Sequence, residues 1–180
     1  MKTKLSEKIH IPEGVSCVYH DKMFTCTKSG VSLSRRIEIP RVIMSIKGNE
    51  IIFDSEKGNK NQFKMIKSNI AHINNLFQGL NEKFTYSLEA CNVHFPMTLK
   101  LEHGKLIINN FLGEKVPRTA VILPDVNVDV KGVKITVTSH NREHAGQTAA
   151  NIEKATKIRN RDRRIFQDGI YLIERPGRQM

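Results

Sequence analysis

Six basic side chains lie within an eleven-residue stretch that holds a single acid, Asp162: Lys154, Lys157, Arg159, Arg161, Arg163 and Arg164. An arginine binds two phosphate oxygens at once through its planar fork, and a lysine binds as a point charge. Arg175 and Arg178 add two cations in the tail. Blocks of like charge also occur on solvated surfaces, but this one has little acid to balance it. The stretch therefore indicates contact with the phosphate backbone of a nucleic acid.

Two more basic residues, Lys115 and Arg118, follow a glycine in the sequence NFLGEKVPR. One interpretation is a loop whose backbone approaches a phosphate at Gly113, with the two cations beside it. An ordinary turn between strands, with the glycine present for its torsion angles, explains the same residues. The sequence leaves both interpretations open.

A helix N-terminus offers another place for a phosphate. Gly146 and Gln147 precede the second predicted helix, so the free N–H groups of its first turn could bind an anion beside Gln147. Capping of those N–H groups by Ser139 or Asn141 is the competing prediction.

The residue patterns of catalysis, nucleotide hydrolysis and metal binding are missing from the sequence. His140 and His144 have the spacing of zinc ligands on a helix, but no HExxH motif or cysteine partner accompanies them. Neither GxxxxGKS/T nor GxGxxG occurs, and no nucleophile, base and acid form a recognisable set. We therefore predict no enzymatic activity, no catalytic residue, no cofactor and no metal site.

The whole chain is basic. Lysine and arginine outnumber aspartate and glutamate by 29 to 18 in 180 residues, which gives a net charge of +11. The excess is +6 over residues 1–83 (14 against 8) and +5 over 84–180 (15 against 10). This balance favours a polyanionic partner, nucleic acid first and an anionic membrane second.

The totals also bear on compartment. Hydrophobic content of 39% indicates a globular protein. The opening residues lack the apolar core of a signal peptide, and no apolar run approaches the ~18 residues of a membrane span. Three cysteines without a CxxC pair do not suit a disulfide framework and favour a reducing compartment. We expect a cytoplasmic protein.

Matches at one spacing indicate that the chain contains two copies of one module. HIP (10–12) and HFP (94–96) lie 84 residues apart. KGNEIIFDS (47–55) and KGVKITVTS (131–139) lie the same distance apart. Collinear self-similarity of this kind marks a duplicated structural unit.

Each copy has the same predicted order of elements: strands, then an apolar hairpin, then one helix. In the second copy, valine and isoleucine alternate with other residues on both sides of a two-residue turn at Lys131-Gly132. Apolar residues at three- and four-residue steps predict the two helices: Phe63, Ile66, Ile70, Ile73 and Phe77 in the first copy, and Ala149, Ile152, Ala155 and Ile158 in the second.

Strands followed by one helix predict an antiparallel sheet that the helix covers. We therefore predict an α+β fold built from two tandem copies of this small module, 1–83 and 84–180. The basic segment should leave the second helix near Ile158 and continue extended along a groove of folded RNA. An apolar run should anchor it to the module: Ile165, Phe166, Ile170, Tyr171 and Leu172.

Several motifs resemble one known family. NNFLGEKVPR (109–118), HFP (94–96), QTAANIEKAT (147–156) and NRDRRIFQDGIYL (160–172) resemble the archaeal and eukaryotic branch of the large-subunit ribosomal protein L-six family, called L-nine in eukaryotes. The segment 11–35 is similar to that family's opening segment. The resemblance covers nearly the whole chain, and the family is itself a tandem duplication of an α+β module.

The resemblance implies a structural, non-enzymatic protein of the ribosome. Its expected partners are large-subunit ribosomal RNA, gripped by the second module near the sarcin–ricin loop, and neighbouring ribosomal proteins; no membrane and no small-molecule substrate is expected. The first module would face protein neighbours or solvent. Two alternatives stay open. One is a free-standing nucleic-acid-binding protein, which would be favoured if aromatic side chains were exposed for stacking, although most of them fall at predicted core positions. The other is a small enzyme for an acidic substrate, which would need a pocket with shifted pKa values.

Overall fold

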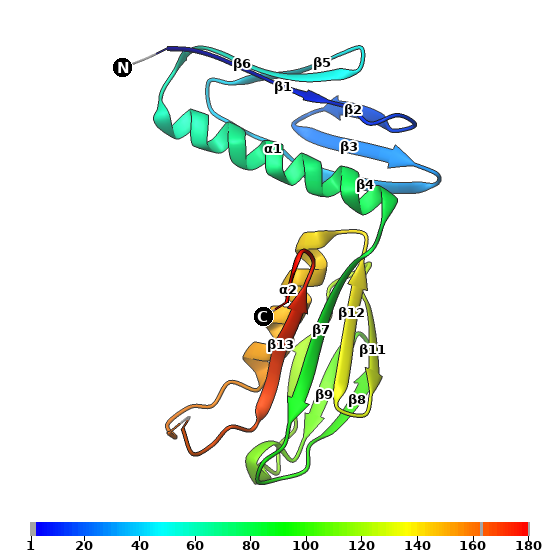
Figure 1. Ribbon diagram of the computed structural model, residues 1–180, viewed down its shortest axis with the longest axis vertical. Helices are drawn as coiled ribbons and strands as arrows, with labels where there is room; N and C mark the ends of the chain where they lie inside the picture. Colours follow the sequence, from blue (N-terminus) through cyan, green and yellow to red (C-terminus); the bar gives the residue numbers. More distant parts are fainter. Residues whose placement is uncertain (1–2, 163, 180) are drawn as a thin grey trace. The chain divides into compact units, whose positions relative to one another are not determined.

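The computed structural model describes residues 3–162 and 164–179. The chain divides into two compact units, Met1–Glu82 and Lys83–Met180, and Figure 1 shows the elements of each. Both units contain antiparallel sheets and an α-helix, which confirms the predicted α+β class. In the described part of the chain, no helix is long and apolar enough to cross a membrane.

The first unit consists of two small sheets and a helix. Its elements are β1 (Thr3–His10), β2 (Ser16–His20), β3 (Met23–Lys28), β4 (Val31–Arg36), β5 (Ile43–Lys47), β6 (Glu50–Gly58) and α1 (Lys60–Asn81). The sheets have the orders β1-β6-β5 and β2-β3-β4, with all neighbours antiparallel. The core between sheets and helix includes Phe24, Ile51 and Phe53, none of them exposed.

Helix α1 begins with a capping box at Asn59. The Asn59 side chain accepts hydrogen bonds from the backbone of Asn61 and Gln62, and the Gln62 side chain accepts one from the Asn59 N–H. These bonds satisfy N–H groups that no helix carbonyl reaches. The predicted face is buried at Ile66, Ile73 and Phe77, but the prediction for Phe63 was wrong. That ring is 39% exposed and lies under the Lys67 ammonium group.

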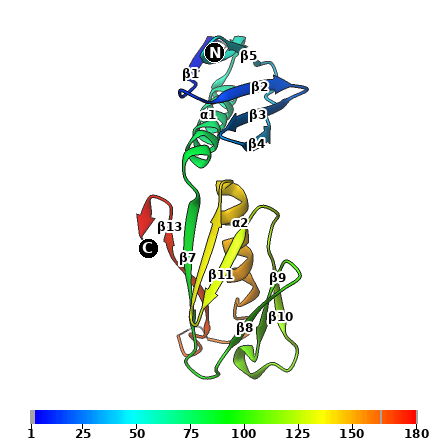
Figure 2. The same ribbon diagram turned by 90° about the vertical axis from the view of Figure 1, so that its right-hand side faces the viewer.

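The second unit repeats this plan and adds two strands, β13 and β14. Its elements are β7 (Phe84–Cys91), β8 (Thr98–Glu102), β9 (Lys105–Asn109), the short 3₁₀ turn η1 (Phe111–Gly113), β10 (Arg118–Val121), β11 (Asn127–Lys131), β12 (Lys134–Ser139), α2 (Arg142–Ala155), β13 (Gly169–Arg175) and β14 (Arg178–Gln179). One sheet has the order β10-β9-β8 and the other β11-β12-β7-β13-β14. Helix α2 packs on β7, β12 and β13 and also contacts β10 (Figure 2).

The two units share strand order and spacing. The β5–β6 hairpin of the first unit and the β11–β12 hairpin of the second begin 84 residues apart, and β2 and β8 begin 82 apart. The sheet β1-β6-β5 corresponds to β7-β12-β11. The second unit differs because β13 pairs antiparallel with the free edge of β7. The repeat seen in the sequence therefore reappears as a repeat of topology.

The turn of the second hairpin lies one residue later than the alternation predicted. Lys131 pairs with Lys134, so the two turn residues are Gly132 and Val133 rather than Lys131-Gly132. Gly132 has φ +61°, a conformation that glycine adopts without steric cost. Alternation identified the two strands correctly. It did not place the turn, because a lysine such as Lys131 is compatible with a strand end as well as with a turn.

All three cysteines are free thiols. Cys17 and Cys26 lie opposite each other in the β2–β3 pair. Burial, and secondarily the neighbouring Cys17, raises the pKa of the Cys26 thiol to about 12. Cys26 therefore acts as a core residue of the first unit rather than as a nucleophile.

Candidate nucleic-acid interface

A cationic groove lies where helix α2 ends. It has a volume of about 390 Å³ and is formed by the last turn of α2, the residues after it and the start of β10. Four of its six lining residues are cations: Arg118, Lys154, Lys157 and Arg159. The other two, Thr119 and Ala155, are uncharged, so none of the described residues that line the groove is a carboxylate. This cationic groove concentrates the positive charge that phosphate binding requires.

Thr156 ends the helix and ties it to β13. Its hydroxyl donates to the Glu153 carbonyl at 3.2 Å and accepts the N–H of Ile170 at 2.9 Å. Thr156, Ile158 and Ile170 are all buried. The basic segment therefore leaves the helix close to the predicted position and starts from a fixed point.

Arg118 forms one wall of the cationic groove and is held entirely by its own chain. Its guanidinium donates to both carboxylate oxygens of Glu114 at 2.7 and 2.5 Å. It also donates to the carbonyls of Ala155 and Lys157 at 2.9 and 3.2 Å. The Phe111 ring lies 4.2 Å from its central carbon. The hydrogen bonds from Arg118 in turn lower the pKa of Glu114. Arg118 therefore clamps the end of α2 to the loop before β10.

The basic loop, which we define as residues 157–168, is not extended as predicted. The backbone turns at Asp162, whose carbonyl accepts the N–H groups of Ile165 and Phe166, and whose carboxylate accepts the N–H of Arg164. Asn160 has φ +57°, another local reversal. Asparagine and aspartate stabilise such turns because their short side chains hydrogen-bond the nearby backbone. Arg161 and Arg164 are both exposed on this loop.

A chain of contacts holds the basic loop against the loop between β7 and β8, at one end of the unit (Figure 1). Arg161 lies over the Phe166 ring at 4.8 Å, and Phe166 packs on His94 with ring centres 5.3 Å apart. His94 Nδ1 is 2.8 Å from the carboxylate of Asp168. The same carboxylate accepts the N–H groups of Val93 and His94 at 2.7 and 2.9 Å.

Asp168 is completely buried. Burial raises its pKa, but the hydrogen bonds from the His94 backbone and ring and from Val93 outweigh that effect and bring the pKa to about 2. The negative charge is thus stabilised by donors that converge on it. Asp168 therefore fixes the base of the basic loop.

The predicted apolar anchor is correct in part. Ile170 is buried, and Phe166 and Leu172 are half-buried against the core of the second unit. Ile165 and Tyr171, however, are 62% and 43% exposed. Ile165 falls in the turn after Asp162, and Tyr171 takes the outward direction of a strand whose alternate residues point inward.

The predicted start of the second helix, on which the proposed anion site depended, was wrong. The helix begins at Arg142, so Gly146 and Gln147 lie inside it rather than before it. The Asn141 side chain accepts the N–H groups of Glu143 and His144, as the capping alternative predicts. Gln147 instead donates to Asn151 at 2.9 Å. Gly146 is explained by packing, since a Cβ there would lie 3.0 Å from the Tyr86 hydroxyl oxygen.

The remaining predicted residues do not gather at the cationic groove. Lys115 is exposed on the loop after η1. Arg175 ends β13 and Arg178 begins β14, at the opposite end of β13 from the basic loop. Arg163 lies outside the described residues. The structure thus brings together Arg118, Lys154, Lys157 and Arg159, with Arg161 and Arg164 on the loop that follows.

Sequence reasoning predicted Phe166 as part of the anchor of the basic loop, but it missed His94 and Asp168, which hold the base of that loop. The repeated HIP and HFP motifs drew attention to His94 as part of the duplication, but they gave no partner for it. Asp168 lies 74 residues further on, and only the pairing of β7 with β13 brings the two together. Within residues 3–162 and 164–179, no group of three or more His, Cys, Asp and Glu is placed to hold a metal ion.

Comparison with known proteins identifies the family of this chain. A family model described as Ribosomal protein L6 matches residues 95–169. The large ribosomal subunit protein uL6 of Methanobrevibacter smithii is 40% identical over 95% of this chain and 96% of its own length. The uL6 proteins of Methanococcus vannielii and Methanosarcina mazei are 39% and 40% identical, each over 97% of this chain and over 96% and 99% of their own lengths. The resemblance seen in the sequence is thereby confirmed, and the chain belongs to the ribosomal protein L6 family, whose members are structural proteins and not enzymes.

Proposed function

We propose that this protein is a structural component of the large ribosomal subunit and binds ribosomal RNA through its second unit. The proposal extends to this chain what the names of its relatives say of them. The family resemblance implies a position near the sarcin–ricin loop, where translation factors dock. Its further partners would be neighbouring ribosomal proteins.

The cationic groove is the observation that carries the proposal. Lys154, Lys157 and Arg159 meet there beside Arg118, which is already paired with Glu114, and Arg161 and Arg164 continue the charge along the basic loop. A phosphodiester backbone that follows the groove would pass from Lys154 and Lys157 to the loop. Folded RNA is read largely by shape and backbone contacts, which suits cations on an irregular loop.

The buried contacts beneath the basic loop favour tight binding. Asp168 and Thr156 fix its two ends, and the Phe166 ring supports Arg161. A loop that is ordered before binding loses less conformational entropy when the RNA binds. We therefore assign Arg118, Thr156 and Asp168 to positioning, and Lys154, Lys157, Arg159, Arg161 and Arg164 to phosphate contact.

Salt dependence of RNA binding tests the proposal. The full chain should bind a large-subunit ribosomal RNA fragment with an affinity that falls steeply as salt rises, because bound cations displace counterions. Replacing Arg161 and Arg164 together by glutamine should weaken binding. It should also reduce the slope of log affinity against log salt by roughly 1 for each phosphate that is no longer neutralised.

The matched control removes the same charge elsewhere. Lys60 and Lys64 are exposed on α1, and glutamine is a good helix former at both positions. The variant in which Lys60 and Lys64 are both replaced by glutamine should show the same salt slope of RNA binding as the native chain. Equal losses from the two double variants would mean that only total charge matters, and the proposed interface would be wrong.

Location on the ribosome needs a separate measurement. The chain should sediment with large subunits at low salt and be released as salt rises, and it should protect nucleotides at or near the sarcin–ricin loop from chemical probes. Recovery of the chain only in the post-ribosomal supernatant would favour a free-standing RNA-binding protein instead.

A further inference from the structure

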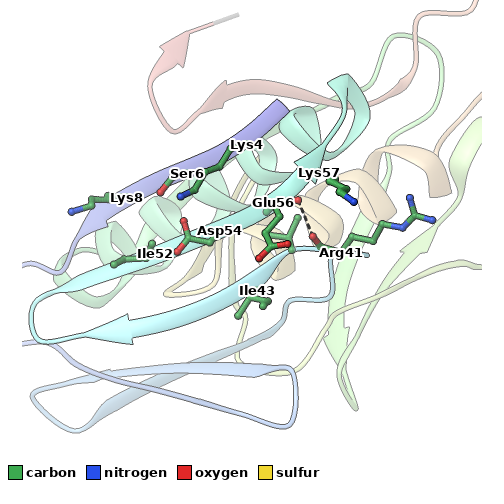
Figure 3. A pocket seen from close by; sticks show the side chains of 11 residues that line it. Lys4, Ser6, Lys8, Arg41, Ile43, Ile52, Asp54, Glu56 and Lys57 are labelled. Atoms are coloured by element: carbon green, nitrogen blue, oxygen red, sulfur yellow. Dashed lines mark hydrogen bonds between the residues drawn. The ribbon is translucent and has the colours of Figure 1, made fainter. Parts of the chain in front are cut away.

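The outer face of the sheet β1-β6-β5, opposite α1, is a second surface that the RNA interface does not use. A hollow of about 980 Å³ lies on it, lined by residues of β1, β6 and the start of β5. Figure 3 shows Lys4, Ser6 and Lys8 from β1 beside Ile52 and Asp54 from β6, with Ile43 on the neighbouring strand. Their neighbours in sequence, Ile51 and Phe53, are buried on the inner face.

The centre of this face is apolar and open to solvent. Ile43 is 74% exposed, and Ile52 is partly exposed beside it. Cross-strand pairing places Ile43 opposite Asp54 and Ile52 between Ser45 and Lys8. Ile43 gains little from burial in its own unit, since most of its side chain remains in water.

The second unit provides an internal comparison for these positions. In the corresponding hairpin, the pair Asn127–Thr138 takes the place of Ile43–Asp54. The pair Asp129–Thr136 takes the place of Ser45–Ile52. The duplicated fold therefore does not need isoleucine at either site. The two isoleucines belong to the first unit's outer face alone.

The charges around this face complement an acidic, partly apolar partner better than a nucleic acid. Lys4, Arg41 and Lys57 surround the hollow and have no ion-pair partner among the described residues, whereas Lys8 is paired with Glu50 at 3.0 Å. Asp54 and Glu56 lie in the same hollow and would repel a phosphate backbone. Isoleucine also offers nothing to a phosphate, whereas apolar residues inside a polar rim are typical of protein interfaces.

We propose that this face docks another protein of the large subunit. The partner sets an apolar side chain against Ile43 and Ile52 and directs carboxylates toward Lys4, Arg41 and Lys57. The inference rests on the proposed ribosomal function and adds to it the surface and the chemistry of one protein contact. It gives the first unit a role separate from RNA binding by the second.

Carbodiimide crosslinking of native large subunits tests the charge contact without any variant. The reagent joins a lysine ammonium group to a carboxylate that it touches, with loss of water and no spacer. Lys4 or Lys57 should be joined to an aspartate or glutamate of another subunit protein. Links only within this chain, or none, would overturn the inference.

A photo-crosslinking pair tests the apolar contact. Subunits should carry the chain with Ile43→p-benzoylphenylalanine or, as the matched control, with Asn127→p-benzoylphenylalanine; both positions are exposed, so the bulky residue leaves the fold intact. Position 43 should crosslink to a peptide of another protein and position 127 should not. A crosslink from 43 to RNA, no crosslink, or equal protein crosslinks at both positions would contradict the inference.

The residues of the second unit suggest a variant that removes the apolar contact. Ile43→Asn with Ile52→Thr should abolish the carbodiimide links of Lys4 and Lys57, while the chain still enters the subunit through its second unit. Unchanged links would count against the apolar contact. If the native chain is absent from large subunits, the proposed function itself is wrong. If the chain is present but forms no link to another protein, only the further inference is wrong.

Discussion

Asp168 is the single side chain on which the geometry of the basic loop depends most. Its carboxylate accepts the N–H groups of Val93 and His94 and contacts the His94 ring, so it joins two loops that are 74 residues apart. A buried charge is stable only when donors surround it, and here they do.

Removing this carboxylate should loosen the second unit. Asp168→Ala leaves two N–H groups and the His94 ring without an acceptor, and each unsatisfied group costs roughly 1–3 kcal/mol. We expect the free energy of unfolding in urea to fall by about 2 kcal/mol or more. The matched variant Asp162→Ala removes an exposed carboxylate of the same loop and should cost less. Equal losses would contradict the role given to Asp168.

The lowered pKa of Asp168 predicts a pH dependence with a definite sign. The pKa is about 2 in the folded chain and 3.8 ordinarily, so the stabilisation is complete above the ordinary value. It is lost as pH falls from about 4 to about 2. The difference in unfolding free energy between the native chain and Asp168→Asn should therefore be constant near neutral pH and shrink below pH ~4. A difference that is independent of pH would contradict this assignment.

Arg118 should act through geometry rather than charge. Arg118→Lys keeps the cation but cannot bond Glu114 and two carbonyls at once or stack on Phe111 in the same way. We expect a loss of about 1–3 kcal/mol in unfolding free energy, with little change in the salt slope of RNA binding. Arg159→Lys, at an exposed position of the same groove, should change stability by less than about 0.5 kcal/mol. An unaltered stability for Arg118→Lys would mean that its hydrogen bonds contribute nothing.

At the scale of elements, the sequence predicted the positions of helices and strands more accurately than the contacts between them. Alternation identified both hairpins, and three- and four-residue spacing identified both helices. The start of α2 was misplaced because Gly146 resembles a helix breaker, whereas it is needed for the close approach of Tyr86. Arg118 was predicted to flank a phosphate. Its hydrogen bonds to the carbonyls of residues 155 and 157 were not foreseen, because those residues lie on another element. Residue spacing along a chain carries no information about such contacts.

The basic loop should depend on the Phe166 ring for its order. Phe166→Leu keeps apolar volume but removes the flat surface that Arg161 and His94 contact. Hydrogen exchange should quicken at the amides of Ile165 and Phe166, which donate to Asp162, while the amides of α2 stay protected. Faster exchange throughout α2 would mean that the variant disturbs the whole unit, and unchanged exchange at the loop would mean that the ring does not order it.

At the scale of the whole molecule, a duplicated module has acquired two different surfaces. The second unit places cations at the end of its helix and adds β13, and the first unit exposes isoleucines on its outer sheet face. The sequence predicted the duplication and the α+β class, because repeats and periodicity are local properties. The family followed from motifs, whereas the contrast between the two outer faces needed the strand register.

If each unit is an independent domain, the two should separate. We expect residues 83–180 to fold alone and to retain the salt-dependent RNA affinity of the full chain within about threefold, since all proposed phosphate contacts lie there. Residues 1–82 should fold and bind the same RNA far more weakly. Comparable affinity of the two fragments would contradict the assignment of RNA binding to the second unit.

A density map of the large ribosomal subunit containing this chain tests the central claim most directly. The prediction is that ribosomal RNA phosphates occupy the cationic groove, within salt-bridge distance of Lys154, Lys157 or Arg159, and continue along the basic loop to Arg161. A groove that faces solvent, or is filled by another protein's carboxylates with no nucleotide nearby, would contradict it.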